Sequence, residues 1–168
     1  MNKGLEIIEA VHLFDILPEK IQVLVHPQSI IHSMVGFEDG SILAHLGQPD
    51  MKTAIAYALS DPERLNIQMD FPDFAALGAL TFENPDTQKF PSLLYAVEAC
   101  RQKGTLPAVM NAANEAAVSA FLDGRIGFPD IFRLVETAMA HHTRIDNPDL
   151  LRIIEADFWA REKVQSLI

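Results

Sequence analysis

Cysteine is almost absent from this sequence of 168 residues, which contains only Cys100. A single cysteine excludes an internal disulfide framework and a zinc cluster built on thiolates, and it fits a reducing compartment. Long apolar runs are missing too: none reaches the roughly 18 residues that a membrane-spanning helix requires, and the first residues lack the apolar segment of a signal peptide. We therefore expect a cytoplasmic protein with no membrane partner.

Positive charge is also scarce. The sequence has 13 Lys and Arg against 23 Asp and Glu, a formal net charge of -10. A protein that grips phosphate backbones or anionic lipid needs clustered basic side chains, and here they are spread along the chain. We expect neither nucleic acid nor a membrane surface as a partner.

Three common nucleotide and hydrolase motifs are absent. No G-x-G-x-x-G follows a predicted strand, and neither G-x-x-x-x-G-K-[ST] nor G-x-S-x-G occurs. The chain is therefore not expected to bind a dinucleotide by a fold of its own. With 49% hydrophobic residues, it can still form an ordinary buried core.

The first half of the sequence mixes helix and strand signals. An amphipathic helix is predicted over 2–14, and the β-branched residues at 21–26 predict a short strand. The segments 30–37 and 41–46 flank an Asp-Gly turn signal at 39–40, which predicts a hairpin. Asp50 is placed to cap a helix over 51–59, and the segment 66–91 predicts loop with one short strand at 79–82.

The second half is purely helical in pattern. Helices are predicted over 92–102, 107–122, 129–142 and 149–167, with Pro or Asp at their starts and Gly after the first two. Short connections favour antiparallel neighbours. Two apolar stripes are expected to face the core, one of Ile131, Leu134, Val135 and Ala138, the other of Leu150, Ile153, Ile154 and Phe158.

These patterns predict an α+β fold. We expect a small mixed or antiparallel sheet with flanking helices, followed by a C-terminal four-helix bundle. The change in character near residue 90 predicts two domains, over 1–88 and 89–168.

Asn2, Lys3 and Glu6 share one face at the start of the first predicted helix, because Glu6 lies one turn beyond both. Free backbone N–H groups, the Lys3 charge and the Asn2 amide suit a phosphate there. The Glu6 carboxylate has the hard oxygen ligands that Mg²⁺ or Mn²⁺ prefers. The alternative is a surface ion pair between Lys3 and Glu6.

Two further groups of polar residues leave open alternatives. His26, His32 and His45 occur on neighbouring predicted strands, which permits a zinc site, although no metal-ligand spacing is present. The string NAANE at 111–115 lies in a small-residue helix. Its amides either line a ligand cleft or tie adjacent helices together.

Three strings in order carry a family resemblance. They are MNKGLEIIEA at 1–10, HPQSIIHS at 26–33 and LGQPDM at 46–51, followed by NAANE at 111–115. Together they resemble 1-deoxy-D-xylulose 5-phosphate reductoisomerase, from the distal part of its catalytic, connecting domain through its C-terminal helical domain.

The resemblance implies an enzyme that rearranges 1-deoxy-D-xylulose 5-phosphate and reduces the product with NADPH to 2-C-methyl-D-erythritol 4-phosphate, for isoprenoid precursors. It implies Mg²⁺ or Mn²⁺ as the metal. Asn2 and Lys3 correspond to residues that bind the substrate phosphate, and Glu6 to a substrate-contacting carboxylate at the metal. Met51 corresponds to the methionine beside the nicotinamide, and His32 lies in a string bordering the site.

The resemblance also implies what this chain lacks. In relatives the NADPH-binding domain, the other metal carboxylates and the flap over the substrate precede the position of Met1. We therefore expect a homodimeric fragment that is inactive alone. Two alternatives remain: a stand-alone dimerising domain whose 21–46 region pairs two copies, and a His-dependent metallohydrolase.

Overall fold

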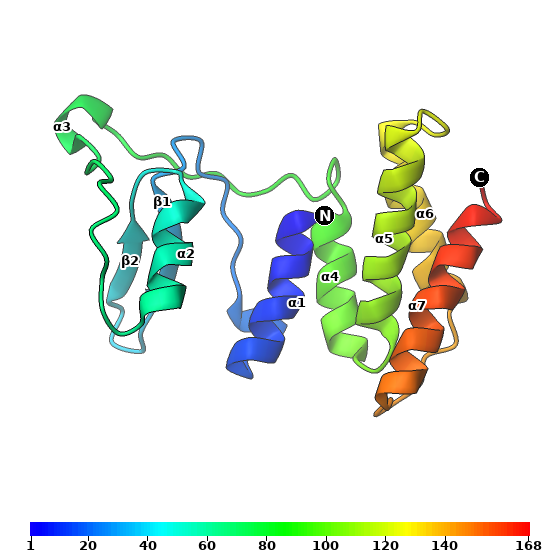
Figure 1. Ribbon diagram of the computed structural model, residues 1–168. Helices are drawn as coiled ribbons and strands as arrows, with labels where there is room; N and C mark the ends of the chain where they lie inside the picture. Colours follow the sequence, from blue (N-terminus) through cyan, green and yellow to red (C-terminus); the bar gives the residue numbers. More distant parts are fainter. The chain divides into compact units, whose positions relative to one another are not determined.

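The computed structural model describes residues 1–168, which form two compact units. One unit contains Met1–Val23 and Asp86–Ile168, and we call it the bundle unit. The other contains Leu24–Pro85, and we call it the hairpin unit. Figure 1 shows helices in both and strands only in the hairpin unit, which confirms the predicted α+β class.

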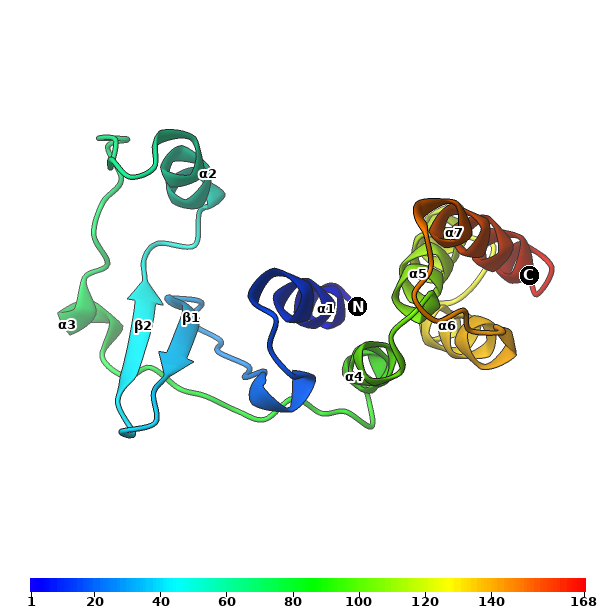
Figure 2. The same ribbon diagram turned by 90° about the horizontal axis from the view of Figure 1, so that it is seen from below.

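The bundle unit is built from helices that neighbour one another in chain order. Its elements are α1 (Asn2–Phe14), the 3₁₀ turn η1 (Pro18–Lys20), α4 (Ser92–Gln102), α5 (Leu106–Leu122), α6 (Phe128–His141) and α7 (Leu150–Gln165). Helix α4 lies between α1 and α5 (Figure 2), and α5 packs against both α6 and α7. The predicted four-helix bundle is therefore present, with α1 added to it as a further helix.

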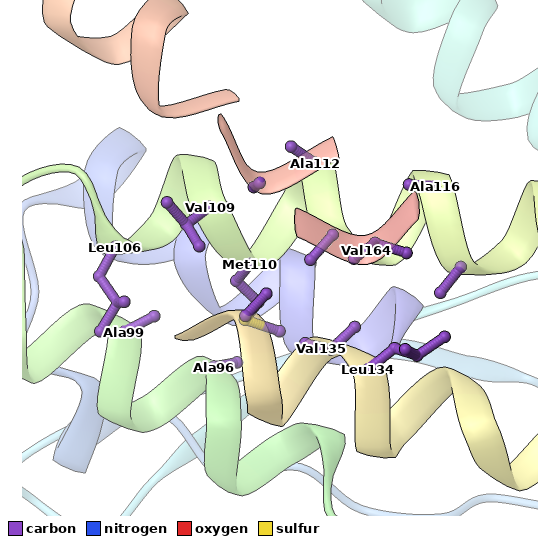
Figure 3. Close-up of a cluster of buried hydrophobic side chains, with 14 of the residues drawn as sticks. Ala96, Ala99, Leu106, Val109, Met110, Ala112, Ala116, Leu134, Val135 and Val164 are labelled. Carbon is purple, nitrogen blue, oxygen red and sulfur yellow. The ribbon is translucent and has the colours of Figure 1, made fainter. Parts of the chain in front are cut away.

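Helix α5 contributes the largest share of the bundle core. Val109, Met110 and a run of alanines on this helix are buried, and they meet Leu134 and Val135 of α6. Figure 3 shows these side chains together with Val164 of α7. Alanines let helix backbones approach closely, so α5 can contact helices on several sides.

Local signals set the ends of these helices. Pro107 lies in the first turn of α5, where its missing N–H costs nothing, and the Asp149 carboxylate caps α7 by accepting from Arg152 N at 2.9 Å. Gly124 follows α5 with a φ of 72°, which glycine adopts without strain. All four predicted bundle helices are confirmed to within a few residues.

The hairpin unit contains a two-stranded antiparallel sheet, β1 (Ile31–Gly36) and β2 (Ile42–Leu46), followed by α2 (Met51–Ser60) and α3 (Phe74–Leu77). The Asp39 carboxylate accepts from Ser41 N at 2.8 Å, and Gly40 takes a φ of 85°. Asp50 caps α2 by accepting from Lys52 N at 2.8 Å. The predicted hairpin and its capped helix are both confirmed.

Two predicted strands do not form. The segment 21–26 makes only a single bridge, between Val25 and Glu83, and Glu83 lies just beyond the segment 79–82. The neighbouring backbone of Thr81 is used by side chains instead: its N–H donates to Gln28 Oε1 at 3.1 Å, and its carbonyl lies 2.8 Å from His26 Nδ1. The Thr81 N–H and carbonyl, which would pair with a neighbouring strand in a longer sheet, are therefore hydrogen-bonded to side chains.

The stripe predicted to face the core on α7 is also wrong. Leu150 and Phe158 are 72% and 63% exposed, and Ile153 and Ile154 are not buried. The core face of α7 carries Ala156, Ala160 and Val164 instead. Small residues permit close packing on the alanine-rich α5, so the large ones remain outside. The α6 stripe, in contrast, is buried as predicted.

The division into compact units differs from the predicted ranges at the N-terminal segment. Helix α1 packs against α4, so it groups with the bundle rather than with the hairpin that follows it. The domain ranges 1–88 and 89–168 stay a prediction. None of the helices combines the length and the apolar character required to cross a bilayer.

Candidate functional site

Three polar residues meet on the exposed face of α1. Asn2 Nδ2 donates to Glu6 Oε1 at 2.7 Å, and Lys3 Nζ donates to Glu6 Oε2 at 2.6 Å. Gly4, Ile7 and Ile8 are the buried residues of the same helix. The 3.6-residue period therefore separates a polar surface from a face packed in the bundle.

The first turn of α1 also offers free backbone donors. Its first helical hydrogen bond runs from Leu5 N to Met1 O at 3.0 Å, so the N–H groups of Asn2, Lys3 and Gly4 have no acceptor within the helix. These groups and the helix dipole favour an anion at this end. The side chains of Lys3 and Glu6 are 63% and 43% exposed, which leaves both accessible to a ligand.

The donor set around Glu6 supplies one carboxylate. No group of three or more His, Cys, Asp or Glu side chains gathers in this chain. Glu6 fits Mg²⁺ or Mn²⁺ by the chemistry of its oxygens, but a single carboxylate does not complete a site for either ion. Both of its oxygens accept hydrogen bonds from Asn2 and Lys3, as in the predicted surface ion pair.

His32 and Met51 belong to the hairpin unit, whereas Asn2, Lys3 and Glu6 belong to the bundle unit. His32 Nε2 lies 3.1 Å from the Ser29 carbonyl, and its ring meets that of His45 edge-on at 5.5 Å. Met51 is the first residue of α2 and is 68% exposed. An exposed methionine at a helix start has the soft, adaptable surface that suits contact with an aromatic ring.

The histidines of the hairpin unit have separate environments. While His32 and His45 adjoin each other, His26 stacks on Phe82 at 4.8 Å between ring centroids. Its Nδ1 is used at the Thr81 carbonyl. The structure therefore does not assemble the three rings that the zinc hypothesis required.

One residue of the NAANE string, Glu115, connects α5 to α7. Asn111 Nδ2 donates to Glu115 Oε1 at 3.1 Å, and Arg161 of α7 donates to Glu115 Oε2 at 2.6 Å. The Arg161 hydrogen bond is the main cause of the lowered pKa of Glu115. Asp157 also accepts from Arg161, at 2.7 Å, and the pKa of Arg161 is raised. Glu115 therefore joins α5 to α7, whereas the Asn111 amide bonds within α5 and the buried Asn114 Oδ1 has no protein hydrogen-bond partner.

A separate cavity of about 230 Å³ opens between α4 and α6 in the bundle unit. Burial, and next the charge of Glu136, raise the pKa of Tyr95 in its wall. None of the predicted site residues lines it; the lining residues are Tyr95, Glu98, Gln102, Leu106, Glu136, Met139 and Ala140. The cavity is thus separate from the polar face of α1.

One contact on the buried face of α1, in the same turn as the polar residues, was not predicted. Gly4 lies so close to α4 that an added Cβ would stand 3.0 Å from the Ser92 carbonyl oxygen and 3.2 Å from Ala96 Cβ. The available signal was a glycine inside an amphipathic helix pattern, which commonly marks close packing. The sequence alone gave no means of identifying the partner helix.

Comparison with known proteins covers the whole chain. The family model described as DXP reductoisomerase C-terminal domain matches residues 46–163. The 1-deoxy-D-xylulose 5-phosphate reductoisomerase of Desulfosudis oleivorans is 56% identical over 168 residues, which are 100% of this chain and 44% of that protein. The chain thus spans less than half the length of this curated relative.

Solved structures agree with the sequence relatives. The reductoisomerase from Zymomonas mobilis in complex with NADPH is 49% identical with a TM-score of 0.92, covering 99% of this chain and 44% of the other. A reductoisomerase in complex with NADPH, fosmidomycin and magnesium is 42% identical, also with a TM-score of 0.92 and the same coverage. The matches in sequence and in fold, over nearly every residue, show that the chain belongs to the 1-deoxy-D-xylulose 5-phosphate reductoisomerase family.

Proposed function

We propose that this chain forms the C-terminal part of an enzyme that converts 1-deoxy-D-xylulose 5-phosphate to 2-C-methyl-D-erythritol 4-phosphate with NADPH. The observation that carries the proposal is the meeting of Asn2, Lys3 and Glu6 on the exposed face of α1. These residues lie in a chain that is 56% identical, over its whole length, to a reductoisomerase.

The start of α1 would bind the substrate phosphate. The Lys3 ammonium supplies a compact positive charge, the Asn2 amide supplies a donor, and the N–H groups of the first turn add further donors. A phosphate dianion would displace Lys3 from Glu6, because the doubly charged group attracts the ammonium more strongly than one carboxylate does. Glu6 is then free to accept from substrate hydroxyls or to meet a cation.

Mg²⁺ or Mn²⁺ would be held in part by Glu6. Bound there, the ion would draw negative charge from the substrate oxygens during the rearrangement. Glu6 supplies one oxygen ligand, and the remaining ligands are proposed to come from the part of the enzyme that this chain does not span. Support comes from the solved relative that contains magnesium.

Met51 and His32 are proposed to border the nicotinamide and the substrate, respectively. Both have exposed positions in the hairpin unit. The chain has no glycine-rich fingerprint for a dinucleotide, so it would not hold NADPH by itself. We therefore propose that the isolated chain does not turn over. Its cytoplasmic location stays a prediction.

The test uses a chimera in which this chain replaces the matching segment of the Desulfosudis oleivorans relative. Glu6→Gln keeps the shape of the side chain and removes its charge, so kcat with Mn²⁺ should fall roughly hundredfold. Glu9→Gln is the matched control, because Glu9 is an exposed carboxylate on the same helix. Equal activity of the two variants would refute the role of Glu6.

The isolated chain needs a separate assay. NADPH oxidation is measured with the chain alone and with a separately expressed N-terminal portion of the same relative. Activity only in the mixture supports the proposal that this chain supplies one part of an active site and the N-terminal portion supplies the rest. Turnover by the chain alone would disprove the proposed dependence on the rest of the enzyme.

A second candidate function is that of a dimerising domain. The hairpin supports it, since Val35 and Leu43 are cross-strand partners that are 58% and 67% exposed. Paired apolar side chains on an open sheet favour a protein partner, here proposed as a second copy. If both the chain and the chimera sediment as monomers at micromolar concentration, the result would count against the dimerising function.

A further inference from the structure

Gly4 lies inside a helix, where glycine is less favourable than alanine. Its backbone does not require glycine, because no positive φ occurs at this position. Glycine is required there because neighbouring atoms leave too little room for a Cβ. A Cβ would stand 3.0 Å from the Ser92 carbonyl oxygen, 3.2 Å from Ala96 Cβ and 3.5 Å from Met110 Cε. The first of these neighbours is backbone and cannot rotate away.

The close contact lies on the same turn as the polar face. Gly4 is one residue from Lys3 and two from both Asn2 and Glu6, on the buried side of α1. The Met1 cap position makes no side-chain hydrogen bond. With 13 residues, α1 is too short to be stable by itself in water. Its position therefore depends on packing against α4.

A second attachment lies beyond the other end of α1. Pro18 of η1 is buried, and Arg101 Nε at the end of α4 donates to Glu19 Oε1 at 2.8 Å. Between the two attachments, Ile7 and Ile8 are buried in the bundle core. Helix α1 is thus held along α4, and Gly4 makes a close contact with α4 at the end that carries the polar residues.

We propose that Gly4 is a positioning residue for the substrate site, which rests on the proposed function of Asn2, Lys3 and Glu6. Gly4 lets the first turn of α1 lie directly on the first turn of α4. This packing sets the position of Asn2, Lys3 and Glu6 relative to the C-terminal helices. A Cβ at this point moves the start of α1 by a few tenths of an ångström. Catalysis is sensitive to such displacements, since about 1 Å costs roughly a hundredfold in rate.

The chimera described above provides the test. For Gly4→Ala we expect kcat/KM for the sugar phosphate to fall roughly tenfold, with KM for NADPH unchanged. Glu9→Ala and Gly36→Ala serve as controls, because Glu9 is exposed and a Cβ on Gly36 meets nothing within 4 Å. A thermal melt of each variant confirms that it is folded at the assay temperature.

The contact can also be altered from α4. Ala96→Ser adds an oxygen beside Gly4 and should also lower kcat/KM, by a smaller factor than Gly4→Ala. This variant tests the contact even if Gly4→Ala fails to fold. The double variant Gly4→Ala with Ala96→Gly removes one of the two short contacts and should recover part of the loss. These changes give a readout that a general loss of stability does not produce.

Wild-type kinetics in folded Gly4→Ala would overturn the proposal, whatever happens to the melting temperature. If Gly4→Ala unfolds, wild-type kinetics in Ala96→Ser would overturn it instead. The Glu6→Gln result separates the two ideas. If Glu6→Gln is impaired and the Gly4 contact is neutral, only the positioning role fails. If Glu6→Gln is also neutral, the proposed site itself is refuted.

Discussion

The bundle unit and the hairpin unit bury their apolar residues very differently. In the bundle unit Leu134, Val109 and Met110 are fully buried within one continuous cluster. In the hairpin unit Ile30 is the one buried hydrophobic residue, and Val35 and Leu43 of the sheet are exposed. A two-stranded hairpin is marginally stable alone in water. The bundle unit therefore has its own core, whereas the hairpin unit leaves apolar side chains of its sheet exposed.

The largest expected effect tests this contrast directly. Leu134→Ala should lower the free energy of unfolding by about 2–5 kcal/mol, because the packed helices around it cannot close the cavity. Leu43→Ala in the hairpin should change it by less than about 0.5 kcal/mol. Urea unfolding of the isolated chain measures both. Similar losses for the two variants would mean that the hairpin is packed as tightly as the bundle.

An intermediate effect is expected at the connection between α6 and α7. The buried Thr105 hydroxyl accepts from Ile145 N at 3.1 Å and lies 2.7 Å from His142 Nε2. Thr105→Val leaves both groups without their partner, at a cost of about 1–3 kcal/mol. Thr137→Val is the control, since its exposed hydroxyl bonds only the Arg133 carbonyl. Equal unfolding free energies for the two variants would show that the Thr105 hydrogen bonds do not stabilise the bundle unit.

The smallest effect concerns pH. Burial lowers the pKa of His142 from its ordinary value near 6.5. The Thr105 hydroxyl can donate its proton to the neutral ring at Nε2 while its oxygen accepts from Ile145 N–H. The folded state disfavours the protonated ring, so stability is full above pH 6.5 and falls as the pH drops toward the lowered pKa.

Solvent screens this half-buried ring, so the change should stay below about 1 kcal/mol. Urea unfolding between pH 7.5 and about 5, with His142→Gln as the reference, measures it. The wild-type chain should lose more stability than the variant over this range. Parallel pH profiles would show that the ring titrates alike in the folded and unfolded states.

Prediction succeeded where a local signal and the packing agree. Asp39 and Gly40 specify the hairpin turn by a side-chain hydrogen bond and a positive φ, and Asp50 specifies the start of α2. Asn2, Lys3 and Glu6 meet because helical spacing alone brings them together. Spacing and helix-end chemistry left a ligand site and a surface ion pair as alternatives, and the family resemblance favoured the ligand site.

Prediction failed where two distant segments decide the outcome. The strand expected at 21–26 depends on whether Thr81 offers its backbone groups, and Gln28 and His26 use them. On α7, hydrophobicity favoured Leu150 and Phe158 for the core, but the face against α5 carries two alanines and Val164 instead. Both outcomes depend on the shape of the partner, which periodicity does not describe.

The sequence by itself determined the long helices, the hairpin and the polar face of α1, because turn chemistry, capping and helical period act within a few residues. The family followed from the resemblance of whole strings, and the short helix α3 (Phe74–Leu77), in a segment predicted as loop, was missed. Only the tertiary structure decided that α1 lies on α4 through Gly4, and that α7 turns its alanines to the core. Those choices depend on how closely two backbones can approach. That distance is set by side chains far apart in the sequence.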